Sequence, residues 1–246
     1  MKEYVLITGA SSSVGRATAV LLSKQYPLIL GGRNLERLKE TCATCNKNEE
    51  HILWQYDLSN VADINSNLAD LMQAHEVKIN KFVHAAGISH LSPLRLTSSE
   101  TMQNVMNVNF FSAVEILKML TNKKVNGKSL SDVVFVSSIS SRWGAKGMSL
   151  YSASKGALDS FARSMAHELA PSVRVNTVLP GGFQKMGGGG VRTPFVAENE
   201  SALQGYLLGE GYAEDIAEVI EFLLSERARW ITGQNFVLDG GKMSHC

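Results

Sequence analysis

The feature that most constrains the fold is a regular alternation of short, β-branched apolar runs with longer amphipathic segments along the whole chain. Such alternation is typical of βαβ units, whose parallel strands are joined by right-handed helical crossovers. Strands are predicted at residues 5–7, 28–30, 51–55, 81–84, 133–136, 173–178 and 236–238, and helices at 14–24, 34–45, 61–74, 99–120, 151–170 and 213–224. The pattern predicts a single doubly wound α/β domain over residues 1–246, with a seven-stranded, mainly parallel sheet and helices on both faces.

Charge and hydropathy exclude several classes of protein. The 246 residues carry a net charge of +1 without a basic block, which argues against nucleic acid as a partner. No apolar run reaches the roughly 18 residues of a membrane span, and the first residues do not form a signal peptide. Three cysteines make no disulfide framework, and the pair Cys42 and Cys45 lacks further ligands for a metal. We expect a cytoplasmic, reduced protein without a metal site.

A glycine-containing turn directly follows the first predicted strand and opens the first helix. Glycine permits a tight turn and a close approach of the backbone to a pyrophosphate, which the helix N-terminus then binds with free N–H groups. A turn of this kind in another place would be a structural turn only, but its position favours a dinucleotide site. The predicted contacts are Gly9, Ser11, Ser12, Ser13, Val14 and Gly15.

The ends of the next strands indicate the type of cofactor. Arg33 follows the second strand, where no carboxylate is present to repel a phosphate, so NADP(H) is favoured over NAD(H). The alternative is an exposed arginine at a turn. Asp57, next to Leu58, follows the third strand and either accepts a hydrogen bond from the adenine amino group or caps a helix. After the fourth strand, the small residues Ala85, Ala86 and Gly87 leave room for the adenosine half of the cofactor.

Three side chains after the fifth strand form a candidate catalytic group. Tyr151 and Lys155 are four residues apart on a predicted helix, so both project from one face. An ammonium nearby is expected to lower the pKa of the phenol, which then exchanges a proton with the oxygen of a carbonyl/alcohol pair. Ser138 is placed to polarise that oxygen. The pattern predicts hydride transfer between a nicotinamide cofactor and a small molecule.

From about residue 3 to residue 241 the chain resembles classical short-chain dehydrogenases/reductases, and most of all the 3-oxoacyl-[acyl-carrier-protein] reductases. The resemblance is carried by Thr8-Gly9-x-x-x-Ser13-x-Gly15, Asp57, Ala86-Gly87, Asn107-Val108-Asn109, Ser138, Tyr151-x-x-x-Lys155, Asn176, Pro180-Gly181 and Asp239-Gly240-Gly241. It implies a Rossmann-type fold, Lys155 also on the nicotinamide ribose, Asn109 holding a water in a proton relay, and Pro180-Gly181 beside the nicotinamide. It further implies a homotetramer, or a dimer, with helices around 100–120 and 151–170 at one interface.

The chain also departs from the family pattern. Ser13 replaces the middle glycine, and His84-Ala85 stand where two asparagines are usual. Lys185 occupies the place of a threonine that grips the carboxamide, and Thr193 substitutes only if the glycine-rich stretch at 181–190 is an insertion. That stretch begins a predicted substrate flap at about 182–208, the alternative being a plain surface loop.

The substrate is the least determined part of the prediction. Ser140, Arg142 and Trp143 lie between Ser138 and Tyr151 and are candidate pocket residues, although Arg142 and Trp143 also fit simple surface packing. The working hypothesis is an NADPH-dependent ketone or 3-oxoacyl reductase, with an acyl carrier protein as a candidate partner. Ser129 and Ser172 stand where arginines dock the carrier in that group, and Lys123, Lys124 and Lys128 are candidate substitutes. The alternatives are a sugar, polyol or other small secondary-alcohol dehydrogenase and, outside enzymes, an NADP-sensing regulatory protein.

Overall fold

The computed structural model describes residues 3–184 and 205–244 and confirms the predicted α/β fold. Its main sheet has seven strands, and each neighbouring pair is parallel. In spatial order these are β3 (Ile52–Gln55), β2 (Leu28–Gly32), β1 (Tyr4–Thr8), β4 (Ile79–His84), β5 (Asp132–Val136), β6 (Arg174–Pro180) and β9 (Asn235–Leu238). The strand order reverses direction between β1 and β4, and in such sheets ligands bind beyond the carboxyl ends of the strands at this point.

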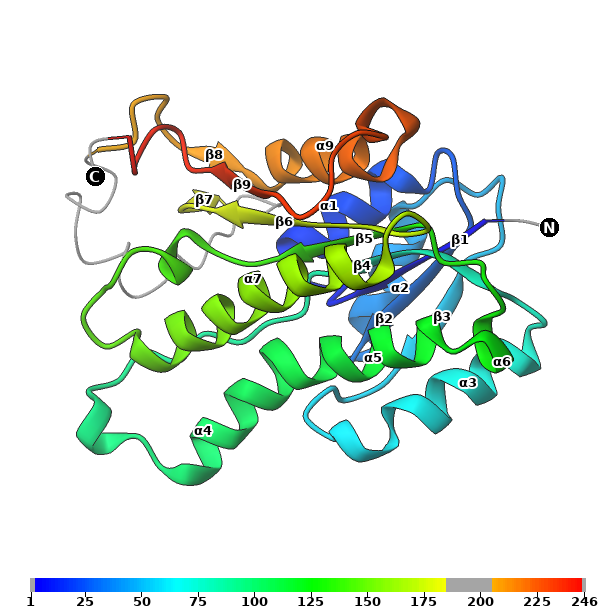
Figure 1. The fold of residues 1–246 in the computed structure, drawn as a ribbon, viewed down its shortest axis with the longest axis horizontal. Coiled ribbons are helices and arrows are strands. Elements are labelled where there is room, and N and C mark those ends of the chain that lie inside the picture. Colours follow the sequence, from blue (N-terminus) through cyan, green and yellow to red (C-terminus); the bar gives the residue numbers. More distant parts are fainter. Residues whose placement is uncertain (1–2, 185–204, 245–246) are drawn as a thin grey trace.

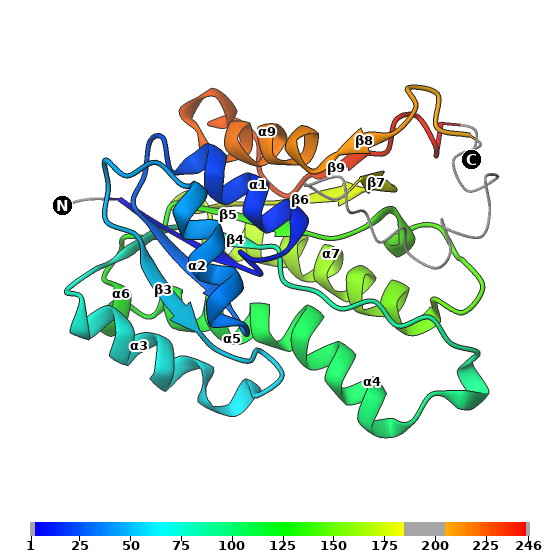
Figure 2. The same cartoon turned by 180° about the vertical axis from the view of Figure 1, so that it is seen from behind.

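Helices cover both faces of the sheet, as the two opposite views show (Figures 1 and 2). One face packs against α1 (Ser13–Leu22), α2 (Leu35–Thr44) and α9 (Ala213–Leu224), and the other against α3 (Ile64–Ala74), α5 (Ser112–Thr121) and α7 (Ser149–Leu169). Within β1, Val5 and Ile7 join the first core, whereas Leu6 joins the second. Because successive side chains of a strand point to opposite faces, a strand buried on both sides needs a continuous apolar run.

The predicted helix at 99–120 contains an irregularity that its sequence did not reveal. α4 (Ser99–Met106) continues into a π-turn at Asn107–Phe111 and then into α5. At this turn the Ser112 N–H bonds the carbonyl of Asn107, five residues back. The short helix α6 (Lys123–Asn126) follows α5.

A second, two-stranded sheet lies beyond the main one. It pairs β7 (Phe183–Gln184) with β8 (Gly211–Tyr212) in parallel, and neither strand was predicted. The intervening chain includes most of the predicted flap, and its residues 185–204, with Lys185 and Thr193, lie outside the described residues. The structure therefore fixes only where this excursion leaves and rejoins the domain.

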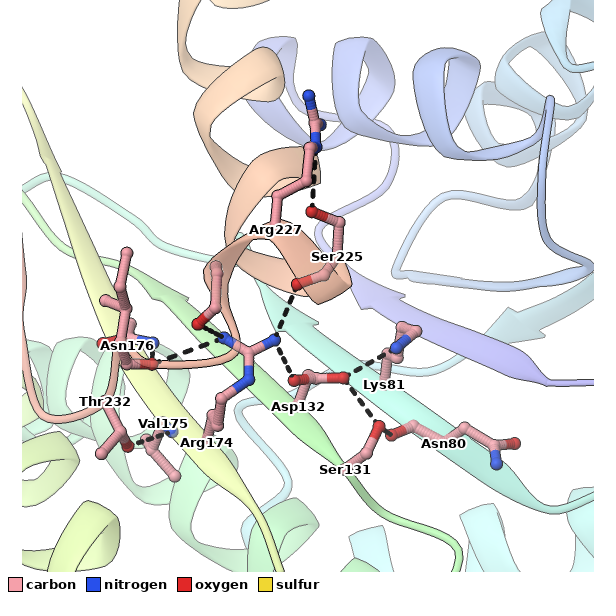
Figure 3. A network of polar contacts seen from close by, with 12 residues as sticks. Asn80, Lys81, Ser131, Asp132, Arg174, Val175, Asn176, Ser225, Arg227 and Thr232 are labelled. Carbon is pink, nitrogen blue, oxygen red and sulfur yellow. Dashed lines mark hydrogen bonds and ion pairs between the residues drawn. The ribbon is translucent and has the colours of Figure 1, made fainter.

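At the amino ends of β4, β5 and β6 a buried network of ion pairs joins the strands (Figure 3). The Asp132 carboxylate accepts from Lys81 Nζ at 2.7 Å and from Ser131 Oγ at 2.7 Å, and it also pairs with Arg174. Arg174 donates in addition to the carbonyls of Ala228 at 2.9 Å and Ser225 at 3.2 Å. The charges at this edge of the sheet are thus paired with one another and with backbone carbonyls.

Candidate active site

The predicted phosphate-binding turn occupies the carboxyl end of β1, and its glycines are required sterically. Gly9 has a φ of +68°, and a Cβ atom on it would lie 2.6 Å from the backbone nitrogen of Ala86. A Cβ atom on Gly15 would lie 2.1 Å from the carbonyl oxygen of Gly9. Ser12 is the N-cap of α1, where its Oγ accepts from the Gly15 N–H at 3.2 Å. The turn therefore packs Gly9 against the segment after β4 and the start of α1 against Gly9, with Ser13 and Val14 in the first helical turn.

Cationic side chains gather at the end of this turn where an adenosine phosphate is expected. The Arg33 side chain is 79% exposed, and its Nη1 lies 4.0 Å from Asp57 Oδ2. Arg37, which the sequence reasoning missed, donates from Nη2 to the carbonyl of Ser11 at 2.7 Å. The sequence feature that could have identified Arg37 is its position in the first turn of α2, four residues after Arg33. The Arg37 guanidinium therefore borders the turn, whereas that of Arg33 is open to solvent and faces Asp57.

In the structure, Asp57 and Leu58 make contacts with nearby groups of the protein itself. Asp57 Oδ1 accepts from the backbone N–H of Ser59 at 3.0 Å, which makes an Asx turn rather than the helix cap considered above. Its other oxygen faces Arg33. The Leu58 side chain is buried in the hydrophobic core, so only its backbone is left to meet a ligand.

Ser138 and Tyr151 come from different elements, and the Ser138 hydroxyl acts on the Tyr151 phenol, whose pKa it lowers against the larger effect of burial. Ser138 follows β5, and its Oγ also accepts from the N–H of Ser140 at 3.2 Å. Lys155, one turn after Tyr151 on α7, places its Nζ 5.9 Å from the centre of the Tyr151 ring. The same Nζ donates to the carbonyl of Val136 at 2.8 Å. The structure thus brings together the three residues that the sequence placed in one catalytic group.

The electrostatics of this group differ from the sequence expectation. Burial raises the pKa of Tyr151, and the Ser138 hydroxyl opposes this rise only in part. The expectation of a lowered Tyr151 pKa is therefore wrong for the protein alone, because desolvation of the phenolate by burial is the largest effect on it. Burial also lowers the pKa of Lys155 to about 8, against an opposing effect of the Asp159 carboxylate.

Asn109 lies in the π-turn beside these residues. Its Oδ1 accepts from the N–H of Ile88 at 2.8 Å, and its Nδ2 donates to the carbonyl of Ile88 at 3.0 Å and to Ser154 Oγ at 2.9 Å. A Cβ atom on Gly87 would lie 3.1 Å from Lys155 Nζ and 3.6 Å from Asn109 Oδ1. Gly87 therefore lies next to both the Lys155 and the Asn109 side chains. The proton relay through Asn109 stays a prediction.

The side of the site opposite the phosphate turn contains residues that the sequence reasoning missed. A Cβ atom on Gly181 would lie 3.0 Å from the ring of Tyr206, whose hydroxyl accepts from the Gly182 N–H at 2.7 Å. The Lys242 ammonium lies 5.1 Å from the centre of the Tyr206 ring and 5.5 Å from that of Trp143. These contacts link the segment after Ser138 with the segment after Pro180.

Among the candidate pocket residues, Trp143 is 43% exposed and takes part in the contact with Lys242. Ser140 is half-buried. Arg142, predicted to meet an anionic group, is exposed, and its charge lowers the pKa of Asp159 instead, against the larger effect of burial. The structure thus brings Trp143 to this side of the site, while the contact of Arg142 with an anionic group stays a prediction.

Two other sequence signals have structural explanations. Cys42 and Cys45 are both free thiols, and burial raises the pKa of Cys45 to about 11, which disfavours the thiolate that metals and disulfide exchange need. Within residues 3–184 and 205–244, no three histidine, cysteine, aspartate or glutamate side chains are grouped to hold a metal ion. No helix of this described part has the length and apolar character to cross a membrane.

Comparisons with known proteins show similarity over almost the whole chain. A family model described as Enoyl-(Acyl carrier protein) reductase matches residues 9–243. The 3-oxoacyl-[acyl-carrier-protein] reductase of Mus musculus is 32% identical over 246 residues, covering 98% of both chains. That of Thermotoga maritima is 30% identical over 251 residues, covering 97% of both.

Solved structures extend this similarity to three dimensions. A 4-hydroxyisoleucine dehydrogenase complexed with NADH has a TM-score of 0.87 at 26% identity, covering 98% of this chain and 99% of that one. A short-chain type dehydrogenase/reductase from Mycobacterium ulcerans has a TM-score of 0.84 at 26% identity, covering 98% of this chain and 90% of that one. The matches include both the phosphate turn and the group around Tyr151.

Proposed function

Since the chain belongs to the short-chain dehydrogenase/reductase family, we propose that it reduces a ketone or 3-oxoacyl group to a secondary alcohol with NADP(H). The observation that carries this proposal is the meeting of Ser138, Tyr151 and Lys155 at the carboxyl edge of the sheet. The family uses nicotinamide cofactors, and the cofactor supplies or accepts the hydride. The glycine turn fits such a ligand because it opens α1, whose first N–H groups and positive dipole end suit a phosphate.

In this proposal the phenol of Tyr151 donates the proton that the new alkoxide oxygen takes up. Burial holds the Tyr151 pKa above its ordinary value, so the free protein keeps the phenol protonated at neutral pH, as an acid in the direction of reduction must be. The Ser138 hydroxyl holds the substrate oxygen, and the Lys155 ammonium stabilises the phenolate that remains. A positioned acid of this kind contributes about 10²- to 10⁴-fold to the rate.

We propose NADP(H) rather than NAD(H) as the preferred cofactor because of Arg33. Its exposed guanidinium stands after β2, where the ribose 2′-phosphate of NADP is expected, and no carboxylate follows that strand directly. Asp57, 4.0 Å away, leaves room for the arginine to turn toward a phosphate. Arg37 adds a second positive charge next to Ser11. The similar 4-hydroxyisoleucine dehydrogenase was solved with NADH, so the preference has to be measured.

The similar proteins bear on the substrate class, and exposed apolar side chains bear on the assembly. The names of the similar proteins favour a 3-oxoacyl thioester, presented free or by an acyl carrier protein. The main alternative is a small secondary alcohol, including sugars and polyols. We also propose a homotetramer or dimer through α4, α5 and α7, because Met102 on α4 and Phe111 at the end of the π-turn expose 37% and 39% of their surfaces.

The proposal is tested by following NADPH absorbance with acetoacetyl thioesters, and the reverse reaction with NADP⁺ and a panel of polyols and secondary alcohols. We expect turnover with the thioester and weaker turnover with NADH in place of NADPH. Turnover with polyols only would mean that the substrates are polyols and not 3-oxoacyl thioesters. Tight NADPH binding without turnover on any of these compounds would favour a regulatory protein that senses NADP.

A further inference from the structure

The turn that follows β9 is a sequence motif to which the proposed reaction assigns no role. Its Asp239 side chain is buried, with Oδ1 accepting from the Gly241 N–H at 3.0 Å and Oδ2 from the Met243 N–H at 2.8 Å. The N–H of Lys242 donates to the Asp239 carbonyl at 3.0 Å. The carboxylate therefore closes the chain into a tight turn, and this turn fixes the point from which the Lys242 side chain extends.

The turn packs against the segment that leads into β8. The Leu208 N–H donates to the carbonyl of Gly240 at 3.1 Å, and a Cβ atom on Gly241 would lie 2.9 Å from the Leu207 side chain. Gly240 and Gly241 have φ values of +56° and +84°, which favour glycine. Figures 1 and 2 show the chain before β8 and the chain after β9 side by side at this end of the sheet. The two glycines therefore let these segments approach closely.

The ammonium of Lys242 reaches from this turn to two aromatic rings of different segments. Its Nζ lies 5.1 Å from the centre of the Tyr206 ring and 5.5 Å from that of Trp143, and both distances are typical of cation–π contacts. A Cβ atom on Gly205 would lie 2.9 Å from the same Nζ, so the ammonium is also packed against that backbone. Trp143 belongs to the segment between β5 and α7, whereas Tyr206 precedes β8. One ammonium thus connects two segments that are distant in sequence.

Tyr206 extends this contact to the end of β6, the strand next to β5. Its hydroxyl accepts from the Gly182 N–H at 2.7 Å, and a Cβ atom on Gly181 would lie 3.0 Å from its ring. Because β5 and β6 are paired in parallel, the residues that follow them lie at one edge of the sheet. The proposed function places the substrate carbonyl at that edge, against Ser138. The Tyr206 ring therefore borders the space that this function assigns to the substrate.

We propose that Lys242 is a positioning residue that joins Tyr206 and Trp143 into one wall of the substrate pocket. Trp143 is 43% exposed, and the ammonium limits the positions that its ring takes. A ring that is already held in place loses little conformational entropy when a substrate packs against it, so the wall favours binding. The inference rests on the proposed function for its effect on substrate binding.

The test compares Lys242→Met, which keeps an unbranched side chain without the charge, with Lys242→Arg, whose guanidinium also stacks on aromatic rings. Lys146→Met, at an exposed lysine three residues after Trp143, is the control. We expect Lys242→Met to raise KM for an acetoacetyl thioester about tenfold, with kcat and the dissociation constant of NADPH nearly unchanged, because the wall acts on substrate binding. Lys242→Arg should restore most of the affinity, and the control should match the wild type. A lower kcat at unchanged KM, or the same KM in Lys242→Met and the control, would overturn the proposal.

A second measurement does not rely on turnover. The chain has three tryptophans, so labelling with fluorotryptophan gives three ¹⁹F NMR signals, and the signal of Trp143 is the one that disappears in Trp143→Phe. Lys242→Met should shift this signal and leave those of Trp54 and Trp230 in place, and Lys242→Arg should return it toward its wild-type position. An unshifted Trp143 signal in Lys242→Met would contradict the proposed wall. If the wild type turned over no substrate, the proposed function would fail while the ¹⁹F spectra still decided whether Lys242 positions Trp143.

Discussion

Two buried lysines, one at each edge of the sheet, have opposite surroundings. Lys81, at the amino edge, lies 2.7 Å from the carboxylate of Asp132, which Arg174 and Ser131 also contact (Figure 3). Lys155, at the carboxyl edge, donates to a backbone carbonyl and faces the ring of Tyr151. When a buried charge is paired with an opposite charge, removing either partner destabilises the fold. A buried charge without a close opposite charge lowers the stability of the fold, and its proton or charge is available for chemistry. Substitutions at the two edges should therefore affect different properties.

The largest effect is expected for Tyr151→Phe at the carboxyl edge. Loss of the proton donor should lower kcat about 10³-fold, which corresponds to about 4 kcal/mol of transition-state stabilisation. NADPH binding and thermal stability should stay close to those of the wild type, since the ring remains. Tyr4→Phe, in β1 at the amino edge, is the control and should leave kcat unchanged. A turnover of Tyr151→Phe near the wild-type value would remove this residue from its proposed role.

Asp132→Asn should have the complementary effect at the amino edge. The substitution leaves Lys81 and Arg174 buried side by side without a counter-charge, so the free energy of unfolding should fall by about 3 kcal/mol. This is measured by urea denaturation against Asp70→Asn, an exposed aspartate of α3. Turnover per folded molecule should not change. An equal loss of stability in both variants would mean that the ion network contributes nothing specific.

Lys155→Met should reveal the stability cost of the lysine at the carboxyl edge. In the folded protein this amine loses its proton near pH 8, but in the unfolded chain near its ordinary value of 10.5. Between these values the unfolded chain binds the extra proton, so the stability of the wild type should rise with pH relative to the variant. At neutral pH the variant should be more stable by about 2 kcal/mol, after allowing for the lost bond to Val136.

The measurement for Lys155→Met is denaturant unfolding at several pH values from neutral to alkaline, with Lys81→Met in parallel. The stability advantage of Lys155→Met should shrink through this range, while Lys81→Met should be less stable than the wild type, because Asp132 loses a partner. A Lys155→Met variant that is less stable than the wild type at neutral pH would contradict the comparison of the two lysines.

The smallest effect is expected for Arg33→Ser, at the exposed end of the carboxyl edge. Removal of one solvent-accessible charge should weaken NADPH binding about tenfold, or about 1.4 kcal/mol, and leave NADH binding nearly unchanged. Fluorescence titration with both cofactors measures this, and Arg95→Ser, an exposed arginine after β4, serves as control. Equal weakening of both cofactors would assign Arg33 to the adenosine that they share, rather than to the 2′-phosphate.

The sheet and the grouping of Ser138, Tyr151 and Lys155 were predictable because both depend on local patterns. Apolar runs such as 133–136 identify buried strands, and parallel strands bring their carboxyl ends to one edge. The π-turn was not predictable, since the helical pattern of 99–120 continues through it. Tyr206 and Lys242 were missed because they are distant in sequence from Trp143, and their meeting depends on tertiary structure alone.

The pKa of Tyr151 shows a different limit. A neighbouring ammonium is visible in the spacing of two residues, whereas the desolvation that raises this pKa depends on everything packed around the phenol. Sequence reasoning therefore identified the pair and gave the wrong sign for the free protein. The burial of His84 was equally invisible in the sequence, because its packing between Phe82 and Phe135 follows from strand pairing rather than from its neighbours in the chain.

The pairing of β7 with β8 has an evolutionary consequence. These two short strands hold Phe183 opposite Gly211 and Gln184 opposite Tyr212, which fixes the points where the chain departs from the domain and returns. A lengthened stretch between those anchors would still leave and rejoin the domain at the same two points. Such a gene would thereby be able to diversify between two fixed points of attachment while the residues grouped around Tyr151 stay in place.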